Sequence, residues 1–135
     1  MAADVNHVTK RDRHVPVPGG HVFVREWIPL APIVGVSPVV LLHDSLGCVE
    51  LWRDFPERLA RAVRRPVIAY DRLGFGQSSA RHAPPSVDFI TEEADRYFPA
   101  VRQALGFSTC SLFGHSVGGG MSIVIAATMP DCCEH

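Results

Sequence analysis

The pattern of apolar positions along the chain changes its period several times, and each change marks a predicted element. Residues 21–27 alternate between apolar and polar side chains, which is typical of a strand with one buried face. Residues 38–42 and 66–70 are continuous apolar runs, which are typical of strands covered on both faces. A shorter strand is predicted over residues 110–113, directly before a glycine-rich turn. Residues 14–17 are expected to add an edge strand, since proline is tolerated at a sheet edge.

Three stretches with a helical period lie between or after these strands. Residues 51–63 place apolar side chains on one side and charged ones on the other, which predicts an amphipathic helix. A second helix is expected over about residues 86–105, bent near Pro99 and stopped by Gly106. A third helix, apolar nearly all round, is predicted over about residues 117–129.

Buried strands that alternate with helices predict an α/β fold, with a mostly parallel sheet and helices on both of its faces. In such sheets, reactive groups gather beyond the carboxyl ends of the strands. The 135 residues suffice for one domain with a hydrophobic core. Residues 1–13 are polar and are expected to form a disordered N-terminus, and residues 14–135 are expected to form the domain.

Composition excludes several function classes. The chain is 47% hydrophobic and 20% charged, and 13 basic against 14 acidic residues leave a formal net charge of −1. This balance gives no electrostatic basis for binding nucleic acid or an anionic membrane. Neither a signal peptide nor a membrane span is recognisable, so a cytoplasmic, reducing location is expected. Cys48, Cys110, Cys132 and Cys133 are therefore expected to stay reduced, and the last two lack the spacing of a zinc site.

Residues 114–118 read Gly-His-Ser-Val-Gly and stand where the last predicted strand turns into the last predicted helix. G-x-S-x-G in this setting predicts a nucleophile elbow, a strained turn that exposes one serine hydroxyl. Gly114 and Gly118 remove side chains that would collide across the turn. The helix N-terminus then offers the N–H group of Val117 to negative charge on a substrate oxygen. Ser116 is thus a candidate nucleophile, and the alternative is a serine that only caps the helix.

Two further loops follow predicted strands, at residues 43–47 (His-Asp-Ser-Leu-Gly) and 71–79 (Asp-Arg-Leu-Gly-Phe-Gly-Gln-Ser-Ser). Together with residues 114–119, their order and spacing resemble the α/β-hydrolase superfamily over nearly the whole chain. The resemblance implies the N-terminal half of a serine hydrolase, an incomplete fold that lacks the later strands. It also implies a second oxyanion donor, the N–H group of Ser45 or of Leu46.

The same resemblance implies roles for the residues around the predicted site. His43 is expected to order its loop through hydrogen bonds, and Asp44 stands where the family usually has a glycine. That glycine often takes a backbone conformation that a Cβ resists, and aspartate tolerates such conformations better than most residues. Leu46 and His115 are expected to line the site with them. His115 is not expected to be the general base, because its ring should project away from the Ser116 hydroxyl and pack beneath the cleft.

The acid and the histidine that would activate Ser116 are not recognisable in the chain. In this superfamily they follow the serine, acid first, but only 19 residues remain after it. Asp131, Glu134 and His135 come at the far end of the predicted helix, ~18 Å away at 1.5 Å per residue. The strand that should flank residues 110–113 is also missing, which predicts an exposed sheet edge. Such an edge beside an apolar helix predicts a partner, self-association or poor solubility.

The resemblance implies a hydrolase that acts on a small ester, thioester or related carbonyl compound, with no cofactor, and no metal site is expected. Ser116 would attack the carbonyl, a histidine outside these residues would take its proton, and the N–H groups of Val117 and Ser45 would hold the oxyanion. Without acid and base, the 135-residue chain is expected to be inactive on its own. Two alternatives stay open: a non-catalytic fragment that binds a companion chain through its sheet edge, or a truncated gene product without a function.

Overall fold

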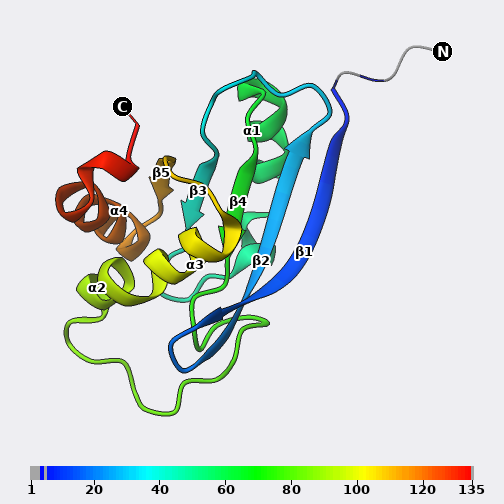
Figure 1. Cartoon of the computed structure of the whole chain (residues 1–135). Coiled ribbons are helices and arrows are strands. Elements are labelled where there is room, and N and C mark those ends of the chain that lie inside the picture. Colours follow the sequence, from blue (N-terminus) through cyan, green and yellow to red (C-terminus); the bar gives the residue numbers. More distant parts are fainter. Residues whose placement is uncertain (1–3, 5, 135) are drawn as a thin grey trace.

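The computed structural model describes residue 4 and residues 6–134, which fold around one five-stranded sheet (Figure 1). The strands are β1 (Val8–Val17), β2 (Gly20–Pro29), β3 (Val39–Leu42), β4 (Val67–Tyr70) and β5 (Ser111–Gly114). Their order across the sheet is β1-β2-β4-β3-β5. β2 is antiparallel to β1 and to β4, whereas β3 is parallel to β4 and to β5. Every strand except β2 therefore runs in the same direction, which confirms the predicted mostly parallel sheet.

β1 starts within the N-terminal stretch that the sequence predicts to be disordered. Residues 8–13 pair with β2, so the prediction of disorder over residues 1–13 is wrong for this part. Most of their side chains are polar and exposed, which gives the sequence the appearance of a solvated tail. Their backbone is held by the antiparallel ladder, and Arg13 adds an ion pair with Glu26 at 2.7 Å. Residues 1–3 and 5 lie outside the described part of the chain.

In the described part of the chain, four α-helices accompany the sheet: α1 (Phe55–Val63), α2 (Phe89–Glu92), α3 (Phe98–Leu105) and α4 (Val117–Thr128). Short 3₁₀ turns precede α1 at Val49–Trp52 and follow α4 at Pro130–Cys132. The predicted start of the first helix at residue 51 is therefore too early, because a 3₁₀ turn comes first and α1 carries Pro56 at its beginning. Within the described residues, no helix combines the length and the apolar character needed to cross a membrane.

The helix predicted over residues 86–105 is shorter and irregular. α2 and α3 are joined by a π-helical turn, Glu93–Tyr97, which ends just before Pro99. Proline has no N–H group for the preceding turn, and the wider turn accommodates this loss. Gly106 ends α3 in the left-handed region at φ 79°, as predicted. The expected bend near Pro99 thus takes the form of a π-helical turn.

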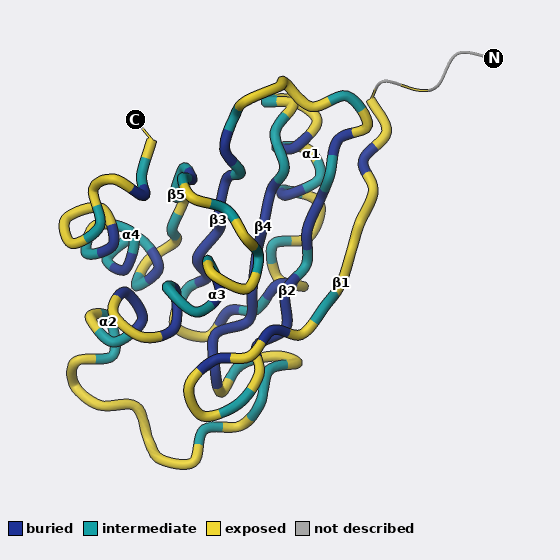
Figure 2. Tube along the Cα trace, viewed as in Figure 1, coloured by how far each residue is buried: buried dark blue, intermediate teal, exposed yellow. Residues whose placement is uncertain are grey.

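The core has two halves, one on each face of the sheet. Buried residues are concentrated along β2, β3 and β4 (Figure 2). Alternate residues of β3 and β4 point to opposite faces, so that Val40 belongs to one half and Val39 to the other. The larger half packs the sheet against α3 and α4, with Phe98 and Met121 fully or nearly buried. The smaller half packs it against α1, where Ala60 is fully buried. Helices therefore cover both faces, as predicted.

The edge formed by β5 is covered only at its start. The 3₁₀ turn after α4 brings the chain back, and Cys133 forms a parallel bridge with Cys110. The Cys110 N–H donates to Cys132 O at 2.8 Å, and the Glu134 N–H donates to Cys110 O at 2.9 Å. The expectation of an open edge over residues 110–113 is therefore wrong at Cys110. Within the described chain, β5 itself pairs only with β3.

Candidate active site

The turn between β5 and α4 has the strained geometry that its sequence predicts. Ser116 has φ 57° and ψ −120°, a region that side chains other than glycine rarely enter and that costs about 1–3 kcal/mol. A Cβ on Gly114 would lie 2.1 Å from Gly118 O, and a Cβ on Gly118 would lie 2.1 Å from Leu42 O. Both approaches involve backbone atoms that cannot move aside, so the two glycines are what allow the turn to close. The Ser116 side chain is left exposed.

The amide groups at the two predicted oxyanion positions make no hydrogen bond with the described residues. Gly118 and Gly119 donate their N–H groups back to His115 O and Ser116 O, at 3.0 and 2.8 Å. The N–H group of Val117, the first residue of α4, has no acceptor among the described residues, nor has that of Ser45. The helix adds a partial positive charge at this end. The N–H group of Leu46, the alternative to Ser45, likewise has no acceptor among these residues, so the structure does not choose between the two.

His43 holds the loop after β3 from inside the protein. Its Nδ1 donates to Asp44 O at 2.7 Å, and its Nε2 accepts the Arg72 N–H at 3.0 Å. These partners assign the neutral ring with the proton on Nδ1. Burial, with the nearby Arg72 charge, lowers the pKa of His43 to about 4. Neutral His43 is thus built into the loop as both a donor and an acceptor.

Arg72 reinforces the same loop, a role that the sequence did not reveal. Its guanidinium donates to His43 O and, at 2.7 Å, to Asp44 O, and it stacks 5.2 Å from the centre of the Phe75 ring. The side chain is buried, with 5% of the residue exposed. Arg72 therefore fixes the backbone on which Ser45 presents its amide.

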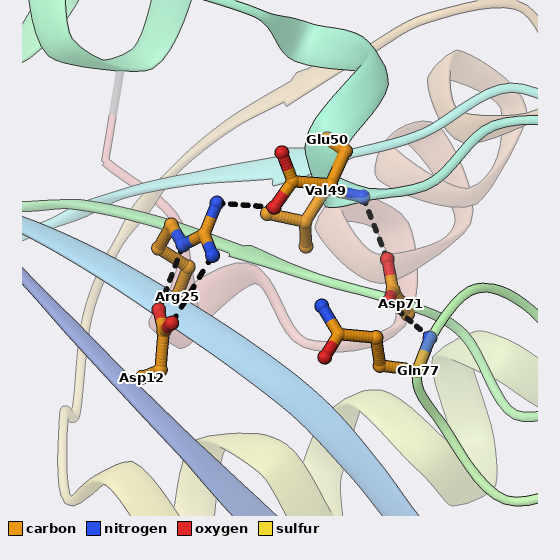
Figure 3. Close-up of polar contacts among 6 residues, drawn as sticks. All are labelled: Asp12, Arg25, Val49, Glu50, Asp71 and Gln77. Atoms are coloured by element: carbon orange, nitrogen blue, oxygen red, sulfur yellow. Dashed lines mark hydrogen bonds and ion pairs between the residues drawn. The ribbon is translucent and has the colours of Figure 1, made fainter.

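Asp71 ties the far end of that loop to the loop after β4 (Figure 3). One carboxylate oxygen accepts the Val49 N–H at 2.6 Å, and the other accepts the Gln77 N–H at 2.8 Å. Gly76 has φ 48°, and a Cβ there would lie 2.2 Å from the same carboxylate. Figure 3 also shows Arg25 between Asp12 and Glu50. Arg25 thereby joins the β1–β2 hairpin to the 3₁₀ turn that contains Glu50.

Asp44 causes no backbone strain at the position where the family usually has glycine. Among the described non-glycine residues, positive φ values occur only at Arg53, Arg64 and Ser116. The expected conflict with a Cβ is therefore absent. The Asp44 carboxylate instead faces His115, whose Nδ1 lies 3.5 Å from its Oδ2.

His115 does not pack beneath the cleft as predicted. Its side chain is 66% exposed. The His115 backbone N–H donates to Leu42 O at 3.1 Å and extends the pairing of β5 with β3, which leaves the ring on the outer side, near Asp44. His115 still lines a hollow of about 120 Å³, together with His43, Asp44, Gly47, Cys48, Leu51 and Trp52. Leu46 is 86% exposed at the tip of its loop and does not line this hollow.

The described residues supply neither an acid nor a base to Ser116. Its hydroxyl makes no hydrogen bond with any of them. Glu134, which follows the 3₁₀ turn after α4, is engaged by Ser37 at 2.8 Å and by Arg65 at 3.4 Å. His135 lies outside the described part of the chain. No cluster of three or more metal-binding side chains is found between residues 6 and 134.

The His43 environment predicts a loss of stability on mild acidification. The folded-state pKa of about 4 lies below the ordinary value of 6.5, so the unfolded chain binds the proton first. The contribution of His43 to the free energy of unfolding is complete above pH 6.5. It falls by about 3 kcal/mol as the pH decreases toward 4. Burial raises the pKa of Glu93, so the folded chain holds this proton more tightly than the unfolded chain does. Glu93 therefore lowers stability as the pH rises above 4.5, which is opposite in sign to the contribution of His43.

Urea unfolding of the chain and of His43→Gln, measured between pH 4 and 7, isolates this contribution. Carboxylates titrate in both proteins, so their contribution cancels in the difference. The variant should lose less stability on acidification than the parent chain. Equal losses in the two proteins would contradict the assignment of a buried, neutral His43.

Comparison with known proteins agrees with this geometry. A family described as the alpha/beta hydrolase fold matches residues 37–134, which is more than half of the chain. The chain belongs to the α/β-hydrolase family. Among solved structures, a proline iminopeptidase from Mycobacterium smegmatis superposes with a TM-score of 0.81 at 28% identity, covering 91% of this chain and 41% of that one.

Two curated relatives share the same region. The chain is 35% identical over 104 residues to 1-acylglycerol-3-phosphate O-acyltransferase ABHD5 of Homo sapiens. It is 30% identical over 99 residues to (lyso)-N-acylphosphatidylethanolamine lipase of Bos taurus. Each match covers 73% of this chain and 28% of the relative, so the chain spans little more than a quarter of these proteins.

Proposed function

We propose that this chain carries the nucleophile and oxyanion half of a serine hydrolase that acts on a small ester, thioester or related carbonyl compound. Ser116 attacks the carbonyl carbon, and its proton passes to a histidine that is not among these residues. The N–H groups of Val117 and Ser45 hold the oxygen that becomes negative. No cofactor takes part, and the four free thiols fit a reducing, cytoplasmic setting.

The observation that carries this proposal is the conformation of Ser116. Strained backbone persists only where the surrounding structure enforces it, and it concentrates at functional sites. A serine that only capped α4 would need neither this conformation nor the two tight glycine contacts, and its side chain makes no capping hydrogen bond. The relatives named as acyltransferase, lipase and peptidase support acyl-carbonyl chemistry.

A covalent probe tests the nucleophile without requiring turnover. With an alkyl fluorophosphonate in excess, Ser116 should be modified faster than any other exposed serine, because its adduct oxygen can bind the free amides. Peptide mass spectrometry locates the modified residue. Ser116→Ala should abolish this modification, and Ser108→Ala, on an exposed loop, should leave it unchanged. Uniform slow modification of all serines would overturn the proposal.

An ester-hydrolysis assay tests the second part, that the 135-residue chain is inactive by itself. The chain and Ser116→Ala should hydrolyse 4-nitrophenyl acetate at the same background rate, since no described acid or base reaches Ser116. Turnover that depends on Ser116 would contradict this part.

A second candidate function rests on the partly open edge of β5. Phe113 is 47% exposed on this strand and Ile123 is 71% exposed on the adjoining α4. An unpaired strand beside apolar side chains suits a companion chain or a second copy that extends the sheet. Size-exclusion chromatography separates the cases, because a strict monomer at all concentrations would count against self-association through this edge.

A further inference from the structure

Two hollows adjoin on the face of the sheet covered by α3 and α4. The first, of about 210 Å³, begins at Ser45, the proposed oxyanion donor. The second, of about 280 Å³, lies beneath the loop that precedes α2. Leu73 and Arg81 line both hollows, so the two are neighbours, and the first includes Ser45 of the proposed site.

The first hollow is suited to an apolar group. Apolar side chains form the larger part of its wall: Leu73, Phe75, Pro85, Phe89 and Met121. Arg72 and Arg81 also line it, and the Arg72 guanidinium is already engaged by His43 O and Asp44 O. Its one acid, Glu93, is 4% exposed and already accepts the Tyr70 hydroxyl at 2.6 Å. Burial raises the pKa of Glu93, while the Tyr70 hydrogen bond and the charges of Arg72 and Arg81 act against this shift. The apolar side of this hollow suits a short alkyl or acyl chain.

The second hollow gathers positive charge that the protein leaves largely unpaired. Arg81 and Arg96 both line it, and both guanidinium groups lie over the Tyr97 ring, at 5.7 and 5.6 Å from its centre. Neither guanidinium donates a hydrogen bond to the described residues. Glu92 approaches Arg81 only to 3.8 Å and also accepts a hydrogen bond from the Ser86 hydroxyl.

An anion in this hollow would satisfy donors that the fold holds in place. Guanidinium groups bind phosphate oxygens through paired N–H donors, and stacking on an aromatic ring limits their freedom. Two of them line this hollow and Glu92 is its one acidic lining residue, so positive charge is in excess. The complementary ligand group is a phosphate ester.

We propose that the two hollows together bind an amphiphilic substrate, with an apolar chain near Ser45 and a phosphate ester against Arg81 and Arg96. The inference deepens the proposed function, on which it rests for the position of the reacting carbonyl. It names the substrate class as a carbonyl compound that carries both a short apolar chain and a phosphate group.

Three probes separate the parts of this proposal: monohexyl phosphate, 1-hexanol and inorganic phosphate. Each is titrated into the ¹⁵N-labelled chain, and dissociation constants are taken from amide shifts of residues around the two hollows. Monohexyl phosphate should bind at least tenfold more tightly than either other probe. Equal binding of 1-hexanol would overturn the phosphate contact, and equal binding of inorganic phosphate would overturn the joint use of the two hollows.

Variants then locate the contact. Arg81→Gln with Arg96→Gln should weaken monohexyl phosphate by roughly tenfold or more, since hydrogen bonds to charged groups are lost. Arg81→Lys with Arg96→Lys keeps the charge and should retain much of the binding, even if the glutamine pair perturbs folding. Arg58→Gln removes an equally charged, 76% exposed side chain from α1 on the opposite face and should change binding less than twofold. Equal weakening by Arg58→Gln would overturn the proposed site.

Binding requires no turnover, so this test is independent of the fluorophosphonate experiment. Absence of preferential Ser116 modification, with monohexyl phosphate still bound through the arginines, would refute the proposed function and keep the anion site. Ser116 modification without phosphate-dependent binding would do the reverse.

Discussion

Gly118→Ala is expected to destabilise the chain by about 3 kcal/mol, because the added methyl group collides with the backbone. The new Cβ would lie 2.1 Å from Leu42 O and 2.8 Å from His43 O, far inside van der Waals contact. These carbonyls belong to the interior strand β3, between β4 and β5, and to the loop that follows it, which cannot retreat without breaking the sheet. The substitution should therefore lower the urea midpoint and also displace Ser116.

Gly120→Ala provides the matched control, since it adds the same methyl group to the same helix. Its Cβ would meet only the flexible tip of Ile90, at the ordinary distance of 3.5 Å. Alanine also has a higher helix propensity than glycine, so this variant should be stabilised by up to about 1 kcal/mol. Similar stability of the two variants in urea would show that α4 does not approach β3 as described.

Asp71→Ala is expected to cost about 3 kcal/mol, since two backbone N–H groups would lose a charged acceptor inside the protein. Both bonds are short, at 2.6 Å from Val49 and 2.8 Å from Gln77, and Asp71 is only 2% exposed. The loss should loosen the loop of Ser45 as well as the loop after β4. Amide hydrogen exchange at Val49 and Gln77 would report this local opening directly.

Asp12→Ala is the comparison that separates burial from charge. Asp12 also pairs with an N–H donor at 2.7 Å, the Arg25 guanidinium, and this hydrogen bond lowers the pKa of Asp12. Its side chain is 47% exposed, so the pair is largely screened by water and its loss should cost less than about 1 kcal/mol. A cost as large as that of Asp71→Ala would contradict the importance assigned to burial.

The pattern of apolar residues was sufficient to predict strands and helices whose burial repeats over a few residues. The apolar runs at residues 38–42 and 66–70 place β3 and β4 correctly, because strands buried on both faces leave no polar positions. Residues 8–13 were misjudged because their stability comes from backbone pairing with β2, which polar side chains conceal. The π-helical turn before Pro99 likewise depends on packing that the helical period does not record.

The candidate site also contains residues that the sequence predicted and residues that it did not. The elbow was predictable because glycine at residues 114 and 118 has a purely local cause, the close approach of backbone on both sides of Ser116. Arg72 could have been suspected only from its place in the Asp-Arg-Leu-Gly-Phe-Gly loop. Nothing in the sequence distinguishes its buried guanidinium from the exposed one of Arg58. His115 was misplaced because the direction of its ring depends on how β5 pairs with β3.

The sequence by itself determined the order of strands and helices and the strained serine turn, since both follow from the size and polarity of neighbouring residues. Only the tertiary structure decided which loops meet at that turn. His43, Asp71 and Arg72 come from different strand ends, and their hydrogen bonds form only once β3 and β4 lie side by side. The arginine-lined hollow arises for the same reason, because its wall joins the β1–β2 turn to a distant helix. Contacts between distant segments carry no periodic signature, so they depend on the folded chain.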